Sequence, residues 1–217
     1  EMCIRDSLMY LKRKADAYLN AWKSDPNRSP LIIKGPRQVG KTETIDYFAA
    51  HNYRSVVEIN FVEEPKYRAI TADGYGANTI VRNISLIDPA KKFIPGDTLI
   101  FFDEIQAHPD IATALKFFKI DGKYDVICSG SMLGISYKQI ESNSVGYKTD
   151  YEMRSLDFEE FLWARGYDEA VIESMFTHLC DATPFSEVEM NVFSTAFMDY
   201  CVLGGMPAVV ASHIRTG

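Results

Sequence analysis

Between residues 8 and 155, short apolar runs that predict strands alternate with stretches of helical spacing. The runs Leu31–Ile33 and Leu99–Phe102 contain only apolar residues and follow turn-forming sequences, which is typical of strands covered on both faces. Alternating strands and helices favour a parallel sheet with right-handed crossovers. The predicted strands are Leu31 to Lys34, Val56 to Phe61, Thr98 to Asp103, Asp125 to Ser129 and, at an edge, Lys148 to Arg154. The predicted helices are Tyr10 to Lys23, Thr42 to Ala50, Lys66 to Thr71, Asn78 to Ile84 and Ile111 to Phe118.

From Asp157 onward the pattern is helical only. We therefore expect an α/β core over residues 8–155 and a helical subdomain over 156–217, acting either as a lid over a ligand or as packed core. Its predicted apolar stripes are Phe158, Phe161 and Leu162, and then Val171, Met175 and Leu179. The apolar run Tyr200 to Ala211 close to the end predicts a truncated C-terminal region. Residues 1–7 show no periodicity and are left out of the fold prediction.

A glycine-containing loop follows the first predicted strand and precedes a predicted helix. Residues Gly35 to Thr42 read Gly-Pro-Arg-Gln-Val-Gly-Lys-Thr, the full spacing of a phosphate-binding loop. Glycines let successive amide N–H groups point at phosphate oxygens, and the following helix N-terminus adds positive potential. In this pattern Lys41 supplies a charge and Thr42 a hydroxyl for Mg²⁺. The predicted nucleotide-binding residues are Gly35, Pro36, Arg37, Gln38, Val39, Gly40, Lys41, Thr42 and Glu43.

Two carboxylates end the predicted central strand. Asp103 and Glu104 follow the apolar run Leu99–Phe102, so they should emerge at the carboxyl edge of a parallel sheet, where ligands bind. Asp103 is placed to hold Mg²⁺ through water together with Thr42. Glu104 is predicted to orient and deprotonate an attacking water, with Lys41 as a further catalytic residue. A solvated acidic turn is the alternative interpretation.

A third strand also ends in polar residues. Ser129 and Ser131 follow the apolar stretch Val126–Cys128. In a parallel sheet they would lie near the loop and the carboxylates, where either serine could contact the γ-phosphate or the attacking water. Capping of the next turn or helix explains them equally well.

Taken together, these motifs resemble the prokaryotic ATP-binding proteins of the AAA superfamily, and more narrowly the branch with a C-terminal domain of unknown function. The resemblance runs from about Leu11 to the end and includes Ser155 to Leu162 and the turn Gly204 to Pro207. It implies a P-loop ATPase core with strand order 5-1-4-3-2, helices on both faces, and ATP and Mg²⁺ as ligands. Many relatives carry a Gly-Arg pair before the last strand. Here Ser144 to Lys148 reads Ser-Val-Gly-Tyr-Lys, which leaves Lys148 as a substitute charge.

Charge and composition narrow the choice of partners. The net charge is −7, with +4 in residues 1–45 and −11 in the remainder, and an acidic surface repels nucleic acid. The basic run Lys12, Arg13, Lys14 is either a nucleic-acid patch or, more commonly, a solvated helix face. No apolar run is long enough to span a bilayer, and the four cysteines lack metal-ligand spacing, which favours the cytoplasm.

Two classes of function remain open on the sequence. The first is a Mg²⁺-dependent ATPase whose hydrolysis drives or gates a conformational change, as a homo-oligomer or with a protein partner. The second is a nucleotide-gated binding module with little or no turnover. A small-molecule kinase is weaker because no acceptor pocket is predicted, and a GTPase is weaker because the chain has no Asn-Lys-x-Asp segment.

Overall fold

The computed structural model describes residues 10–131 and 146–216 of the chain. These residues form two compact units. One contains residues 18–37 and 41–153, and the other contains residues 38–40, residues from 154 onward and the residues before 18. Residues 1–7, and Ser144 and Val145 of the segment Ser144 to Lys148, lie outside the described residues.

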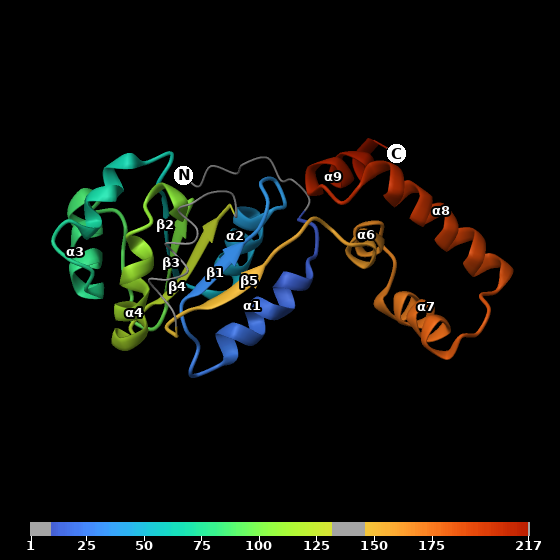
Figure 1. The fold of residues 1–217 in the computed structure, drawn as a ribbon, viewed down its shortest axis with the longest axis horizontal. Helices are drawn as coiled ribbons and strands as arrows, with labels where there is room; N and C mark the ends of the chain where they lie inside the picture. The colour runs from blue at the N-terminus through green and yellow to red at the C-terminus, as the bar shows by residue number, and fades with distance from the viewer. Residues whose placement is uncertain (1–9, 132–145, 217) are drawn as a thin grey trace. The chain divides into compact units, whose positions relative to one another are not determined.

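Five parallel strands form a single sheet in the first unit (Figure 1). Their order is β2-β3-β4-β1-β5, which from the opposite edge is the order 5-1-4-3-2 that the family resemblance implied. The strands are β1 (Leu31–Lys34), β2 (Ser55–Asn60), β3 (Thr98–Asp103), β4 (Asp125–Gly130) and β5 (Thr149–Glu152). The P-loop fold with an edge position for β5 is therefore confirmed.

Burial along each strand explains its place in the sheet. All six residues of β3 are buried, as expected for a central strand that is covered on both faces. The edge strands β2 and β5 instead contain exposed positions, and no residue of β5 is fully buried. Continuous apolar sequence thus marks the centre of the sheet, and alternation marks its edges.

Helices cover both faces of the sheet. One face carries Ile32, Ile100 and Phe102, which pack in one core with residues of η1 (Pro65–Thr71), α3 (Ala77–Ile87) and α4 (Ile111–Asp121). Side chains alternate along a strand, so the equally buried Leu31 and Phe101 face the opposite side. There lie the C-terminal part of α1 (Lys14–Ser24) and α2 (Lys41–Asn52), whose Trp22 and Phe48 rings are 6.3 Å apart.

The helix predictions hold in position and differ in detail. Helix α1 begins at Lys14, four residues after the predicted start, and Asp16 accepts a hydrogen bond from Arg13 N at 2.8 Å, as an N-terminal cap does. The segment predicted as a helix at Lys66 to Thr71 is the 3₁₀ helix η1. A second 3₁₀ turn, η2 (Ile105–Ala107), follows the two carboxylates.

The second unit is helical over residues 158–216. Its helices are α6 (Phe158–Ala164), α7 (Glu169–Asp181), α8 (Glu187–Leu203) and α9 (Pro207–Thr216). Two of them begin with reciprocal capping boxes, Asp157 with Glu160 at α6 and Ser186 with Glu189 at α8. Among the described residues, no helix is both long and apolar enough to cross a membrane.

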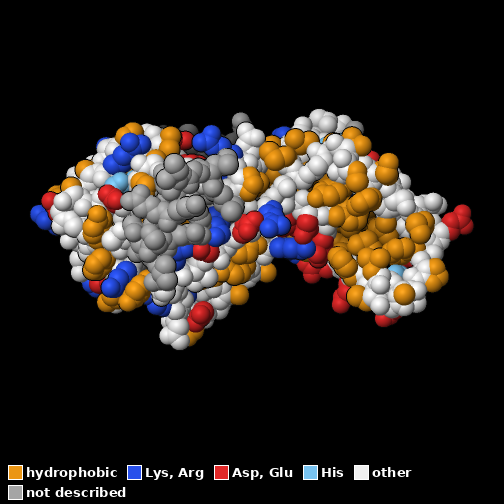
Figure 2. All heavy atoms as spheres, in the orientation of Figure 1, with side chains coloured by type: hydrophobic (Ala, Val, Ile, Leu, Met, Phe, Trp, Pro, Cys, Tyr) orange, Lys and Arg blue, Asp and Glu red, His pale blue; other side chains and the backbone are white. Residues whose placement is uncertain are grey.

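The predicted apolar stripe of α7 is partly wrong. Val171 and Leu179 are exposed, whereas Ile172 and Met175 are buried against Leu162 and Phe193. Exposed apolar side chains gather over this unit (Figure 2). A groove of about 520 Å³ runs between α6, α7 and α8, and its lining includes Phe158, Phe176, Leu179, Met190 and Phe197. The buried residues of α7 are those on the face that contacts α6 and α8. The spacing of apolar residues within α7 does not by itself identify that face.

Candidate functional site

The loop between β1 and α2 has the tight backbone that its sequence predicts. A Cβ atom on Gly35 would lie 2.0 Å from the carbonyl oxygen of Met153, so only glycine fits where the loop leaves the sheet. Gln38 and Gly40 have positive φ values of 64° and 87°. Gln38 is a non-glycine residue in the left-handed region, which costs conformational energy and is common at ligand-binding loops.

Lys41 lies at the first position of α2, and its side chain folds back across the loop. Its ammonium donates to the carbonyl oxygens of Gly35 at 3.0 Å and Pro36 at 2.7 Å, and the residue is 8% exposed. Burial lowers the pKa of Lys41, against the opposing influence of the Glu104 and Asp103 carboxylates. A buried cation held by neutral carbonyl groups is suited to exchange those partners for anionic oxygens.

Thr42 and Asp103 bring the two main sequence motifs together. The Thr42 hydroxyl donates to Asp103 Oδ2 at 3.3 Å, although 61 positions separate the two residues. Thr42 lies in the first turn of α2, and Asp103 is the last residue of β3, where it is 4% exposed. The hydroxyl and the carboxylate thus form one oxygen-rich position at the carboxyl edge of the sheet.

Three further donors fix the Asp103 carboxylate. The backbone N–H of Glu104 donates to Oδ1 at 2.9 Å, and the Ser129 hydroxyl donates to the same oxygen. The Asn60 side-chain amide donates to Oδ2 at 3.3 Å. Asn60 is paired with Asp103 in the register of β2 and β3, and its own Oδ1 accepts from the backbone N–H groups of Val62 and Glu63. The carboxylate is held in one orientation by side chains from two neighbouring strands and by the backbone N–H of the next residue.

The sequence prediction did not include Asn60 among the site residues. The available signal was its place at the end of a strand next to β3, where it shares an edge with Asp103. Asparagine at a strand end is also a common turn residue. Asn60 has that role here as well, because its Oδ1 accepts from the backbone N–H groups of Val62 and Glu63.

Glu104 follows Asp103 in a left-handed conformation, with φ 54° and ψ 46°. Its side chain accepts a hydrogen bond from Gln106 Nε2, a second residue that the sequence prediction did not include. Gln106 packs against β4, because a Cβ on Gly130 would lie 2.9 Å from Gln106 Oε1. Strain of this kind in a non-glycine residue costs roughly 1–3 kcal/mol and is found where a side chain must be aimed.

The remaining predicted residues fall into three groups. Ser131 is buried directly after β4, while Pro36, Arg37 and Glu43 are exposed around the loop. Lys34, the last residue of β1, pairs with Asp150 at 3.5 Å. Lys148 also bonds to Asp150, at 2.6 Å, with a side chain only 8% exposed. The role of Lys148 as a substitute charge therefore stays a prediction, with its charge paired to Asp150 in this structure.

Comparison with known proteins identifies the kind of domain. A family model described as an AAA domain matches residues 27–162, and a search of curated proteins found no match. Drosophila ORC bound to DNA has a TM-score of 0.50 and 12% identity, covering 92% of this chain and 58% of that one. The Aeropyrum pernix ORC1 protein in complex with DNA has a TM-score of 0.46 and 12% identity, covering 73% and 50%. C. elegans PCH-2 has a TM-score of 0.42 and 11% identity, covering 93% and 66%. This chain spans half to two thirds of the length of those chains.

Proposed function

The chain belongs to the AAA domain family, and from that premise we propose that it binds ATP with Mg²⁺ and hydrolyses ATP to ADP and phosphate to drive or gate a conformational change. One observation carries the proposal. The Thr42 hydroxyl lies 3.3 Å from Asp103 Oδ2, so the phosphate loop and the acidic strand end converge on one point. This convergence supports a P-loop nucleotide site over a glycine-rich turn that lies near an unrelated acidic pair.

The donor set fits Mg²⁺ better than a metal held by protein ligands alone. Mg²⁺ prefers oxygen ligands, keeps several waters and is commonly bound through one or two protein groups plus substrate phosphates. Thr42 and Asp103 supply a hydroxyl and a carboxylate, and among the described residues no group of three or more His, Cys, Asp or Glu side chains could hold a metal. Bound Mg²⁺ would neutralise charge on the phosphates.

In this proposal the chain's own groups position ATP and the water. Amide N–H groups of the loop from Gly35 to Thr42, Pro36 excepted because proline has no N–H, cradle the phosphates, with the side chains of Arg37 and Glu43 at the exposed rim of the loop. Lys41 exchanges the carbonyls of Gly35 and Pro36 for phosphate oxygens. Water attacks the γ-phosphorus, the bond to the bridging oxygen of ADP breaks, and Glu104 takes the proton of the water.

The strand-end residues have supporting roles in the same proposal. Ser129 and Asn60 orient Asp103, and Gln106 orients Glu104. Ser131 is assigned to the γ-phosphate or the attacking water on its position alone, directly after β4.

Partners and location belong to the proposal as well. We propose a homo-oligomer or a protein partner in the cytoplasm, because AAA hydrolysis commonly uses an arginine from a neighbouring subunit. Arg82 and Arg154 have the exposure that such a role needs, whereas Arg68 donates to the Phe61 carbonyl oxygen at 3.1 Å. Two of the similar structures contain DNA, but the net charge of −7 argues against extending that ligand to this chain.

Single-turnover ATP hydrolysis with Mg²⁺, measured over a range of protein concentrations, tests the proposal. We expect hydrolysis that rises with protein concentration and that falls by about 10²–10⁴-fold in Glu104→Gln, the effect of losing a general base, while ATP affinity is retained. Glu173→Gln, an exposed carboxylate on α7, is the matched control and should leave the rate unchanged. Normal turnover in Glu104→Gln would contradict the assignment of the base.

The same experiment separates the second candidate function. A nucleotide-gated module predicts tight ATP binding with negligible turnover at every protein concentration. The observation that favours it is the arginine contact between the loop tip and the start of the helical unit, Arg13 with Val39 and Glu160. Absence of ATP binding by the wild-type protein would rule out both functions.

A further inference from the structure

Arg13 is a buried arginine between three segments of the helical unit. The residue is 5% exposed. Nη1 donates to the carbonyl oxygen of Val39 at 2.7 Å, and Nη2 donates to that of Arg154 at 2.6 Å. Nε lies 3.2 Å from Glu160 Oε1, an ion pair without hydrogen-bond geometry. The expectation that the run Lys12 to Lys14 is a solvated face or a nucleic-acid patch is therefore wrong for its central residue.

The contact with Val39 has a consequence for the next amide. The Val39 carbonyl and the Gly40 N–H belong to one planar peptide group, and the described residues contain no cis peptide bond. In a trans peptide the C=O and N–H bonds point in opposite directions. Because Arg13 holds the carbonyl, the Gly40 N–H is directed to the opposite side of the peptide, and in the proposed site it is one of the amides that receive phosphate.

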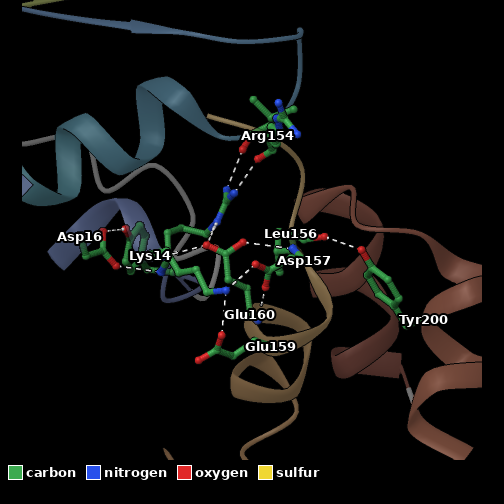
Figure 3. A network of polar contacts seen from close by, with 11 residues as sticks. Lys14, Asp16, Arg154, Leu156, Asp157, Glu159, Glu160 and Tyr200 are labelled. Carbon is green, nitrogen blue, oxygen red and sulfur yellow. Dashed lines mark hydrogen bonds and ion pairs between the residues drawn. The ribbon is translucent and has the colours of Figure 1, made fainter. Parts of the chain in front are cut away.

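Arg13 is itself held in place by the start of α6. Glu160 is 5% exposed, and its Oε1 also accepts from Lys14 N at 2.7 Å. Its Oε2 accepts from Asp157 N at 3.2 Å within the capping box (Figure 3). Lys14 adds exposed ion pairs to Asp157 at 2.5 Å and to Glu159 at 2.7 Å. A single carboxylate thus joins Arg13 to the first turn of α6.

The loop tip is also close to α9. A Cβ built on Gly40 would lie 3.5 Å from Arg13 Nη1 and 3.6 Å from Pro207 Cγ, the first residue of α9. With its φ of 87°, Gly40 sits in a conformation that favours glycine, next to the guanidinium. A change in the orientation of the Val39–Gly40 peptide would therefore alter the surroundings of Arg13 and of Pro207.

We propose that Arg13 is a positioning residue of the nucleotide site, which aims the Gly40 N–H at the phosphates and couples the loop to α6 through Glu160. This inference rests on the proposed ATP binding and adds a route by which nucleotide alters the helical unit. A buried charge is costly unless it is paired, so the two carbonyl acceptors and the Glu160 carboxylate together favour one discrete geometry of the loop.

Titration of MgATP by calorimetry tests the positioning role. We expect Arg13→Gln to weaken binding about tenfold or more, the scale of one hydrogen bond to a charged group. Arg13→Lys, which keeps the charge without the fork, should give an intermediate loss. Lys12→Gln is the matched control: its side chain is 55% exposed, and binding should be unchanged.

Hydrogen exchange of residues 154–164 tests the coupling between the loop and α6. If Arg13 had only a structural role, nucleotide would not change the exchange of this segment. In the wild-type protein MgATP should change protection of this segment, and in Glu160→Gln the change should be reduced although MgATP still binds. The effects of Glu160→Gln and Arg13→Gln on MgATP affinity should also be non-additive in a double-mutant cycle.

The outcomes separate this inference from the function on which it rests. If wild-type protein does not bind MgATP, the proposed function fails and the inference fails with it. If wild-type protein binds and folded Arg13→Gln and Arg13→Lys bind equally well, only the inference is overturned. Unfolding of both arginine variants and of Glu160→Gln would show a purely structural role and overturn it as well.

Discussion

Thr42 Oγ1 and Asp103 Oδ2 lie 3.3 Å apart at the carboxyl edge of the sheet. The two groups come from the first turn of α2 and the last residue of β3, so their approach depends on β1 and β3 lying in one parallel sheet on either side of β4. In the proposed function these two groups share one ligand, Mg²⁺, and the groups around them can be tested one at a time.

Ser129 and Ser131 are equal candidates on the sequence, and we propose different roles for them. The Ser129 hydroxyl donates to Asp103 Oδ1, so Ser129→Ala should disorient the carboxylate. We expect the Mg²⁺ concentration for half-maximal hydrolysis to rise about 10–100-fold, the usual effect of losing a group that orients a metal ligand. Ser131→Ala is the comparison: it should lower the rate of hydrolysis and leave the Mg²⁺ dependence unchanged. A larger shift in Mg²⁺ dependence for Ser131→Ala than for Ser129→Ala would reverse the assignment.

Glu104 stores conformational strain that substitution should reveal. Its φ of 54° is unfavourable for any residue with a Cβ atom, by about 1–2 kcal/mol. Urea denaturation should therefore find Glu104→Gly more stable than Glu104→Ala by about 1 kcal/mol. Both variants should lack hydrolysis. The reverse order is expected at Glu173, which lies within α7, where alanine is favoured over glycine by about 1 kcal/mol. Equal stability of the two Glu104 variants would mean that the strain is absent in solution.

His108 should make the free energy of unfolding depend on pH. The residue is 8% exposed, and its Nε2 lies 3.0 Å from the Thr71 hydroxyl. Burial lowers the pKa of His108 from its ordinary value of 6.5, with Arg68 acting in the same direction and Asp110 against it. Below pH 6.5 the folded state therefore binds fewer protons than the unfolded state. The contribution of His108 to the free energy of unfolding is fully present above pH 6.5 and is lost as the pH falls through the pKa of the folded state.

Denaturation of wild-type protein and His108→Gln at pH 7.5 and at pH 5.5 measures this contribution, with both pH values chosen to lie about one unit from 6.5. Wild-type protein should lose more stability between the two pH values than the variant does. An equal loss in both proteins would show that His108 does not titrate differently in the folded and unfolded states.

The sequence was sufficient where one residue pattern has one physical explanation. The apolar runs of β1 and β3 located central strands because only strands covered on both faces lack polar positions. The proximity of Thr42 and Asp103 was predictable because their motifs have fixed spacing and the sheet topology brings the two motifs together.

Other residues depend on contacts that local sequence does not contain. Arg13 lies in a basic run and is nevertheless buried, because its acceptors come from the loop tip and from the segment after β5. Asn60 and Gln106 act through Asp103 and Glu104 and belong to no motif of their own. In α7 the buried face includes Ile172 and not Val171, since packing against α6 and α8 selects it.

Equilibrium titration of ATP into the protein, with Mg²⁺ and with a chelator, measures whether the loop and the acidic strand end form one MgATP site. We expect saturable binding that Mg²⁺ strengthens, loss of binding in Lys41→Ala, and loss of the Mg²⁺ effect with retained binding in Thr42→Val. Thr42→Ser keeps the hydroxyl and should restore the Mg²⁺ effect. Absence of ATP binding by the folded wild-type protein, or equal binding by Lys41→Ala, would show that Gly35 to Thr42 is not an ATP site.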